Sequence, residues 1–269
     1  MAEKLLVNKP KELRESTPEE ILEMEKKIIE KKEEEDLPIK LTVEEEREKA
    51  IEETKKNAIA AWVPKTELGK MVKEGREKDI DRVLESGKKI LEPEIIDSLL
   101  KLGGDLLLAG QAKGKFGGGK RRAWRQTQKK TMEGNVTTFS CVAVVGDQKG
   151  HVGIGFGKAK ETLPAREKAV RKAKLNIIKI RRGFETKEAP GSEPHTVPFI
   201  VEGKCGSVRI KLLPAPRGTG LVVGDECKKI MKLAGIEDVY GVTKGQTRTV
   251  LNLAQACIDA LNKTNKMLL

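Results

Sequence analysis

The chain has 269 residues, of which 38% are hydrophobic, 35% are charged and only 3% are aromatic. Its 53 lysines and arginines exceed its 41 acidic residues, so the formal charge is +12. This composition excludes a single large apolar core, and the charge indicates a polyanionic partner, most often nucleic acid.

The positive charge is unevenly distributed along the chain. Residues 1–60 hold 13 basic and 18 acidic residues, a net charge of −5, whereas residues 61–269 hold 40 basic and 23 acidic residues, a net charge of +17. The anion-binding part is therefore expected in the last three quarters of the chain.

Neither a membrane span nor a metal site is expected. No apolar stretch approaches the roughly 20 residues of a transmembrane helix, and the acidic start of the chain is unlike a signal peptide. The cysteines at 141, 205, 227 and 257 form no CxxC pair, so they fit neither zinc spacing nor a small disulfide framework. We expect a reduced, cytoplasmic protein with cysteines in its core and no cofactor.

Residues 1–60 are predicted to form two charged helices. The first would begin at Thr17 with Pro18 in its first turn, and the second at Thr42, where Glu45 completes a capping box. Their apolar stripes are too thin to bury a core. We expect a solvated, partly disordered extension, or alternatively an arm that binds a protein.

Residues 61–110 are predicted to form short helices separated by glycine. Apolar residues recur there at helical spacing, namely Ile80, Val83, Leu84, Ile95, Ile96, Leu99 and Leu100.

Residues 111–131 are predicted to be a basic, glycine-rich loop that contacts RNA. The stretch holds eight lysines and arginines, four glycines and no acid, with Phe116 and Trp124 among the charges. Arginine pairs with phosphate and stacks on bases, and glycine lets the backbone approach. The alternative is a solvated linker.

A β-hairpin follows, made of VTTFSCVAVVGD, the turn GDQKG and the strand HVGIGFGKA. Gly153, Gly155 and Gly157 recur at the period of a strand and share one of its faces. The stretch is not a phosphate loop, because Val152 stands where that motif needs its first glycine and Lys158 where a dinucleotide motif needs its last. The bare face would admit either a closely packed helix or RNA.

A basic helix is predicted over residues 161–183. Ala165, Ala169, Ala173 and Ile177 form its apolar row, and Arg181 to Gly183 would end it. From Lys158 to Arg182 there are ten basic and two acidic residues, an excess that indicates phosphate contact more than solubility.

Residues 188–199 form a linker rich in proline and glycine, and residues 200–269 a small α/β domain. His195 in the linker and His151 have no catalytic or metal partner nearby in sequence, so both are expected to be structural or exposed. The domain is predicted to contain a strand over 206–216, a helix that Asp225 caps and Gly235 ends, a strand over 236–245 and a closing helix. The buried stripe of the closing helix would be Val250, Leu253, Ala254, Cys257, Ile258 and Leu261.

The order of these elements resembles small-subunit ribosomal protein five, a universal family. The stretches that carry the resemblance are FSCVAVVGDQKGHVGIGFGKAKE and GKCGSVRIKLLPAPRGTGLVVGDECKKIMKLAGIEDVYG. WVPKTELGKMVKEG, KLNIIKIRRG and PHTVPF are similar to the archaeal and eukaryotic cytosolic branch. The resemblance extends over residues 62–265.

The resemblance implies an α+β fold. A double-stranded-RNA-binding-like domain at residues 132–187 would be followed by a small left-handed βαβ domain, with the helical extension in front. It implies a non-catalytic constituent of the small subunit that holds rRNA near the decoding region and supports translational accuracy. Its neighbours would be small-subunit rRNA, small-subunit ribosomal proteins four and eight, and mRNA where it enters the subunit.

The segment that contacts rRNA in the family corresponds to residues 128–136. Members commonly have basic residues just after the glycine of the loop, whereas this chain has Glu133, Asn135 and Thr137 in the stretch EGNVTTF. We hypothesise that the inserted residues 115–125 supply the missing charge; if they do not, reversing the charge of Lys120, Arg121, Arg122 and Arg125 would leave subunit assembly unchanged.

The candidate rRNA-binding residues are the cations of the loop, the second hairpin strand, the basic helix and the C-terminal turn. They are Lys113, Lys115, Lys120, Arg121, Arg122, Arg125, Lys129, Lys130, Lys158, Lys160, Arg166, Arg181, Arg182 and Arg217. Two other hypotheses are a free-standing RNA-binding module or RNA chaperone, and an enzyme whose phosphate loop is PAPRGTG. No carboxylate–histidine or cysteine–histidine constellation accompanies that loop, so we expect no enzyme.

Overall fold

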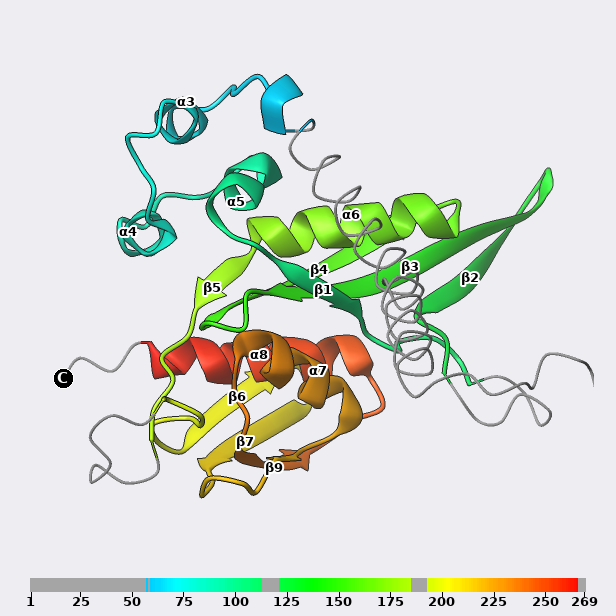
Figure 1. The fold of residues 1–269 in the computed structure, drawn as a ribbon. Coiled ribbons are helices and arrows are strands. Elements are labelled where there is room, and N and C mark those ends of the chain that lie inside the picture. The colour runs from blue at the N-terminus through cyan, green and yellow to red at the C-terminus, as the bar shows by residue number, and fades with distance from the viewer. Residues whose placement is uncertain (1–56, 58, 113–120, 185–192, 266–269) are drawn as a thin grey trace, which may run out of the picture. The chain divides into compact units, whose positions relative to one another are not determined.

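The computed structural model describes residues 57, 59–112, 121–184 and 193–265. Residues 61–269 form one compact unit with a short helical segment, two β-sheets and three further helices (Figure 1). Of the helices expected in residues 1–60, the structure describes only residues 57, 59 and 60, which are helical. Lys113, Lys115 and Lys120 also lie outside the described residues.

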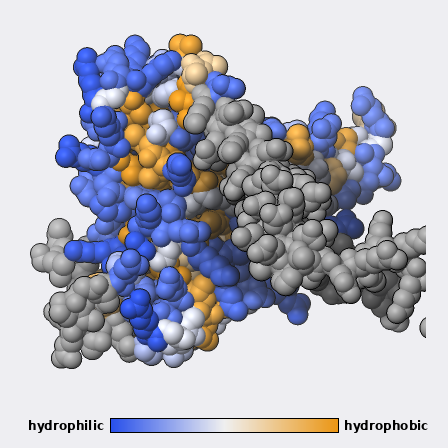
Figure 2. Space-filling model, viewed as in Figure 1, coloured by the Kyte–Doolittle hydropathy of each residue, from blue (hydrophilic) through white to orange (hydrophobic). Residues whose placement is uncertain are grey.

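The helical segment consists of α3 (Glu67–Lys73), α4 (Ile80–Glu85) and α5 (Pro93–Leu99). Its expected apolar positions are confirmed in part, since Val83, Ile95 and Ile96 are at most 1% exposed. They share a cluster with Val145 and Ile177 of the sheet that follows, and Figure 2 shows the hydrophobic side chains gathered between these helices. The segment therefore packs on the first sheet and belongs to the same folded unit.

A partly exposed carboxylate fixes the start of this segment. Glu92 accepts hydrogen bonds from the Trp62 Nε1–H at 2.8 Å and from the backbone N–H groups of Lys65 at 2.9 Å and Thr66 at 2.7 Å. Thr66 in turn caps α3, because its hydroxyl accepts a bond from the Gly69 N–H at 3.1 Å.

The first sheet contains five strands, which belong to one antiparallel network. They are β1 (Gly103–Leu106), β2 (Trp124–Thr131), β3 (Gly134–Gly146), β4 (His151–Ala159) and β5 (Ile177–Lys179). The long strand β3 is the centre, because β1 and β2 pair with successive parts of one of its edges and β4 pairs with the other.

Two expectations are corrected here. Residues 103–106, expected within a helical segment, are β1, and residues 124–131, expected in a loop, are β2. The polar sequence WRQTQKKT forms a strand because β3 supplies backbone partners along its whole length, while its side chains face solvent on both sides of the outer sheet.

The glycines of β4 face the helix α6 (Thr162–Leu175), which covers one side of the first sheet. A Cβ on Gly155 would lie 2.1 Å from the Ala169 carbonyl oxygen, and one on Gly157 would lie 2.1 Å from the Ala165 carbonyl oxygen. Ala165, Ala169 and Ala173 are fully buried on the facing side of the helix. The bare strand face therefore receives a closely packed helix, which leaves no room for RNA between them.

The basic helix ends earlier than expected, at Leu175 instead of Gly183. Asn176 leaves the helical conformation, and Ile177 and Ile178 then pair with Gly153 and Val152 of β4. The β-branched isoleucines extend the sheet as β5, where their shape packs well.

The second sheet has the order β6–β7–β9–β8. Its elements are β6 (Val201–Cys205), β7 (Val208–Pro214), β8 (Leu221–Val222), α7 (Asp225–Ala234), β9 (Val239–Lys244) and α8 (Val250–Thr264). All neighbouring strands are antiparallel except β8 and β9, which are parallel and joined by α7 as a βαβ unit. The sequence did not predict β6 or β8.

The ends of α7 agree with the sequence only in part. Gly235 ends the helix in the left-handed conformation, with φ 78°, as predicted. Asp225, however, is the first helical residue, and Gly224 occupies the N-cap without a side-chain bond.

The helices α7 and α8 lie between the two sheets (Figure 1). Their buried residues, including Ile230, Met231 and Leu261, share one core with Val142 and Val152 of the first sheet. The stripe predicted for α8 is confirmed, with Ile258 only partly buried. The two sheets therefore share one core through the layer of helices between them.

Two glycines bring the β3–β4 turn against the end of α7. A Cβ on Gly146 would lie 2.2 Å from the Leu233 carbonyl oxygen, and one on Gly235 would lie 2.0 Å from the Gln148 carbonyl oxygen. Arg182 bridges the same contact, donating to the carbonyl oxygens of Gly235 and Lys149 at 3.2 Å each.

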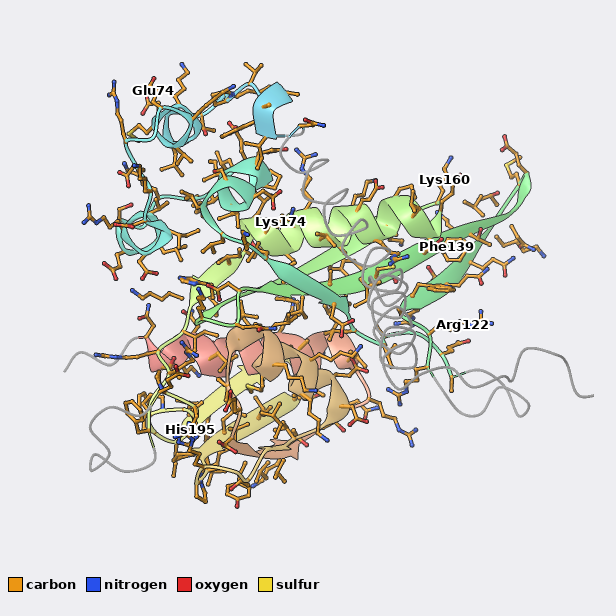
Figure 3. All side chains as sticks on the ribbon, viewed as in Figure 1. Glu74, Arg122, Phe139, Lys160, Lys174 and His195 are labelled. Carbon is orange, nitrogen blue, oxygen red and sulfur yellow. The ribbon has the colours of Figure 1, made fainter. Side chains whose placement is uncertain are left out.

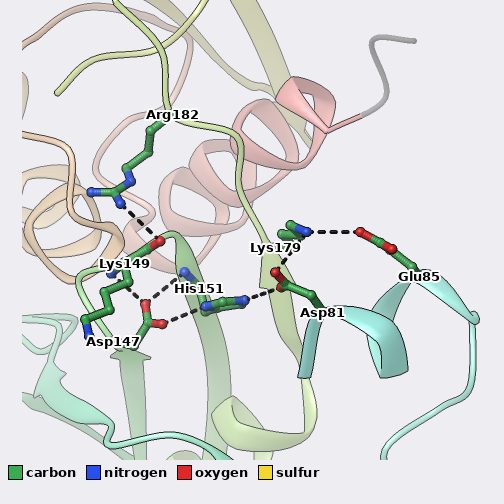
Figure 4. A network of polar contacts seen from close by, with 7 residues as sticks. All are labelled: Asp81, Glu85, Asp147, Lys149, His151, Lys179 and Arg182. Atoms are coloured by element: carbon green, nitrogen blue, oxygen red, sulfur yellow. Dashed lines mark hydrogen bonds and ion pairs between the residues drawn. The ribbon is translucent and has the colours of Figure 1, made fainter. Parts of the chain in front are cut away.

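His151 joins this turn to the helical segment (Figure 4). Its Nδ1 lies 2.6 Å from the Asp147 Oδ2 and its Nε2 lies 2.8 Å from the Asp81 Oδ1 of α4. Both partners are carboxylates, which accept hydrogen bonds, so the geometry favours a doubly protonated ring. Lys179 of β5 completes the network by pairing with Asp81 and Glu85 at 3.0 Å each.

The titration of this network follows from its contacts. Burial acts to lower the pKa of His151, but its hydrogen bonds to Asp147 and Asp81 outweigh burial and hold the pKa above its ordinary value of 6.5. Burial acts to raise the pKa of Asp147 and Asp81, but hydrogen bonds from His151 and other groups hold both below 3.8. His151 is thus structural, as expected.

Replacing Gly155 by alanine is expected to destabilise the protein by about 2–4 kcal/mol, because its Cβ would overlap the backbone of α6. Urea unfolding measures this change. Gly103→Ala is the matched control, since its Cβ would come no closer than 3.6 Å to any atom. Equal stability of the two variants would contradict the close packing of β4 on α6.

The free energy of unfolding is expected to fall as the pH rises through the folded-state pKa of His151. A raised histidine pKa contributes stability that is complete below 6.5 and is lost above the folded pKa, whereas the lowered pKa values of Asp81 and Asp147 contribute stability that is lost only below 3.8. Urea unfolding from about pH 6 to about pH 9 should show this decrease in the native chain and not in His151→Gln. The same decrease in both proteins would exclude His151 as its source.

Candidate nucleic-acid interface

The hairpin of β2 and β3, with the end of β4, carries an open surface on the side of the sheet opposite α6. Residues that pair directly across strands point to the same side, and the glycines of β4 fix which side faces the helix. We call this surface the hairpin platform. It consists of Arg125, Thr127, Lys129, Val136, Thr138, Ser140, Phe156 and Lys158.

Phe156 supplies the aromatic ring of the platform. It shares its face of β4 with Val152, which is fully buried in the core between the sheets, yet Phe156 is 38% exposed. The strand extends past the second sheet and its helices, so the same apolar row is buried at one end and open at the other. The alternation of glycine and apolar residues in the sequence predicted which face of β4 carries Phe156, but it did not predict that Phe156 is exposed.

Three cations lie on the platform at fixed register. Arg125 of β2, Ser140 of β3 and Lys158 of β4 form one row across the sheet. Lys129 lies in the row of Val136, nearer the tip of the hairpin. Among the described residues, Arg125, Lys129 and Lys158 form no ion pair with an acid, so their charges are available to an anion.

Hydroxyl groups fill the space between the cations. The hydroxyl oxygens of Thr127 and Thr138 lie 2.8 Å apart across the two strands, and the Ser140 hydroxyl donates to the Arg125 carbonyl oxygen at 3.3 Å. A surface with cations, hydroxyls and one exposed ring can bind phosphates, ribose hydroxyls and an unpaired base together.

The other predicted residues of this region lie around the platform, not on it. Lys130 pairs in register with Asn135 and therefore points to the α6 side. Arg121 and Arg122 are exposed just before β2. In Figure 3, Lys160 and Arg122 lie on opposite sides of the sheet, so a single flat surface cannot engage both.

The outer face of α6 is a second cationic surface. Arg166 is exposed there, together with Lys168, Arg171 and Lys172. Lys174 differs, because it is paired with Asp97 of α5 at 2.6 Å. The helical segment therefore engages one end of α6 and leaves the basic residues nearer its N-terminus open.

Three predicted cations lie away from the platform. Arg181 is exposed after β5, whereas Arg182 and Arg217 line a pocket of about 740 Å³ with Lys228 and Lys232. Arg182 is half-buried, and it already donates to backbone carbonyls at the β3–β4 turn and the end of α7. The sequence predicted all of these cations as one set of rRNA-binding residues, but in the fold they lie on separate surfaces.

The stretch PAPRGTG is not available as a phosphate-binding loop, because its backbone is already hydrogen-bonded within the protein. The Gly220 N–H donates to the Asp238 Oδ1 at 2.7 Å, and the Asp238 Oδ2 lies 2.8 Å from the His195 Nδ1. Burial acts to raise the pKa of Asp238, but bonds from Gly220 and His195 hold it below its ordinary value. His195 and Asp238 thus fasten this turn to β9, and His195 is buried and structural.

No helix among the described residues is both long and apolar enough to cross a membrane. Within the same residues, no group of three or more histidine, cysteine or acidic side chains could hold a metal ion.

Comparisons with known proteins agree on one family. The model of the ribosomal protein S5 N-terminal domain matches residues 121–181, and that of the ribosomal protein S5 C-terminal domain matches residues 203–268. Small ribosomal subunit protein uS5 of Nanoarchaeum equitans is 47% identical over 210 residues, which cover 78% of this chain and 90% of that protein.

Two further relatives extend the likeness. Small ribosomal subunit protein uS5 of Hyperthermus butylicus is 46% identical over 76% of this chain and 90% of that protein. Small ribosomal subunit protein uS5 of Methanococcus maripaludis strain C6 is 43% identical over 82% of this chain and 90% of that protein. With these identities and the two matched domains, the chain belongs to the ribosomal protein S5 family, the small ribosomal subunit proteins uS5.

Proposed function

We propose that this protein is a structural, non-catalytic constituent of the small ribosomal subunit and that the hairpin platform is its contact with small-subunit rRNA. The observation that supports the rRNA contact is that Arg125, Lys129 and Lys158 lie on the same face of the hairpin as the exposed ring of Phe156. Family membership supports the ribosomal role, since the relatives are named small ribosomal subunit proteins.

The finer placement follows the family resemblance. We propose that the rRNA contact lies near the decoding region, where mRNA enters the subunit, and that it supports translational accuracy. The neighbouring proteins would be small-subunit ribosomal proteins four and eight. The close packing of β4 on α6 supports such a role, because a strand held against a helix can keep an rRNA segment in one position.

The competing function is a free-standing RNA-binding module or RNA chaperone. Such a protein would use the platform without remaining in the subunit. Sucrose-gradient sedimentation of a lysate at low magnesium, after a high-salt wash, separates the two proposals. Stoichiometric retention on the small subunit is expected, and release into the top fractions would favour the transient factor.

Charge reversal on the platform is expected to weaken rRNA binding. Lys158→Glu should lower the affinity for purified small-subunit rRNA by about tenfold or more and reduce the slope of log K against log salt by about 1, because one phosphate contact is lost. Filter binding across a salt series measures both quantities. Lys89→Glu is the matched control, with the same charge change at an exposed lysine of the helical segment. Equal losses in the two variants would indicate a general charge effect and contradict a platform contact.

The ring of Phe156 is expected to contribute by stacking on an unpaired base. Phe156→Leu keeps an apolar side chain but removes the aromatic face, so rRNA affinity should fall by about 5- to 100-fold, as is typical of one stacked base. Phe156→Tyr should retain the native affinity. Urea unfolding of both variants separates binding from stability, and full affinity in the leucine variant would rule out stacking.

A further inference from the structure

The second sheet has helices on only one of its faces. Val208, Ile210 and Leu212 of β7 are buried toward α7 and α8, and Figure 1 shows both helices on that side of the sheet. The alternate residues of the same strands face away from the helices. We call this surface the open sheet face, and it consists of Glu202, Lys204, Arg209, Lys211, Leu213, Val222, Tyr240, Val242 and Lys244.

The strand register places the apolar side chains together on one half of the open sheet face. Leu213, Tyr240 and Val222 form one row across β7, β9 and β8, and Val242 lies next to Tyr240 on the same side of β9. Val222 and Val242 are each 50% exposed and Tyr240 is 40% exposed. Three half-exposed apolar side chains together on one sheet form a patch of the kind that marks interaction surfaces.

A row of cations borders this apolar half. Lys204, Arg209 and Lys244 pair in register across β6, β7 and β9. Within the described part of the chain none of the three forms an ion pair, whereas Lys211 in the intervening row is paired with Glu202 at 3.2 Å. The three cations therefore give the border a net positive charge.

We propose that the open sheet face binds a neighbouring folded protein whose contacting surface carries aliphatic side chains beside a row of Asp or Glu carboxylates. The apolar half would be buried against the aliphatic side chains, and the Lys204–Arg209–Lys244 row would meet the carboxylates. An apolar centre with a charged rim of complementary sign is the usual composition of a protein–protein contact.

The open sheet face and the hairpin platform differ in how cations and apolar side chains are placed around the aromatic ring, and this difference indicates the class of partner. On the platform, the row of Arg125, Ser140 and Lys158 lies next to the ring of Phe156, so a nucleotide could engage phosphate, ribose and base at once. On the open sheet face the ring lies between aliphatic side chains and the cations are confined to one border. Aliphatic side chains at half exposure gain from contact with other apolar groups and gain little from contact with a phosphate backbone.

Photo-crosslinking in purified small subunits tests the proposal. The variant Val242→p-benzoylphenylalanine would be incorporated into subunits, irradiated and digested separately with protease and with RNase. We expect a crosslinked product that survives RNase, is lost with protease, and maps by mass spectrometry to a peptide containing aspartate or glutamate. A product that RNase removes would overturn the proposal in favour of rRNA, and no product from subunits with stoichiometric protein would also overturn it.

Two controls complete the experiment. Adding Arg209→Glu to the crosslinking variant should reduce the yield by about fivefold or more, because the border then repels carboxylates, and an unchanged yield would contradict the charge match. Val63→p-benzoylphenylalanine, at a residue that is 74% exposed in the helical segment, gives the background yield. The proposal is independent of the platform, since Lys158→Glu is expected to lower rRNA affinity without changing the crosslink yield per incorporated protein.

Discussion

The contact between β4 and α6 leaves no space for a side chain on the strand. Gly153, Gly155 and Gly157 each bring the strand so close that a Cβ would lie within 2.3 Å of a carbonyl oxygen of the helix. Because successive strand residues alternate between faces, this contact also determines where every other residue of β4 points. Phe156 and Lys158 are therefore directed away from the helix, onto the hairpin platform.

The same use of glycine joins the first sheet to the layer of helices beneath it. Gly146 and Gly235 let the β3–β4 turn meet the end of α7 at backbone distance, and Arg182 then satisfies the carbonyl oxygens that this approach leaves exposed. Arg182 is charged and was predicted to contact phosphate, but its geometry shows what it already does in the isolated fold. A cation that donates to carbonyls holds backbone segments together, and any phosphate contact at that position would have to use the remaining N–H groups.

The sequence determined much of the fold because its signals were local. Alternating glycines predicted the bare face of β4, the alanine row predicted the face of α6 that meets it, and Gly235 predicted the end of α7. The errors arose where pairing with another strand decides the structure. Trp124–Thr131 is a polar stretch that becomes a strand only because β3 pairs with it. Ile177 and Ile178 satisfied the helical period but also suit a strand, and pairing with β4 decided between the two.

The sequence predicted which charged residues could bind RNA, but it did not predict where on the molecule they lie. Fourteen cations were selected from the sequence. The eleven that the structure describes lie on separate surfaces, and strand register and the extent of the helix layer decide which surface each one joins. The two exposed aromatic rings show this most clearly. Phe156 and Tyr240 both lie on strands, but the side chains next to them on the same face of the sheet are different. The exposed row next to Phe156 holds Arg125, Ser140 and Lys158, whereas Tyr240 lies between Leu213 and Val222. An exposed aromatic residue does not by itself indicate what it binds. The side chains beside it on the neighbouring strands indicate the class of partner.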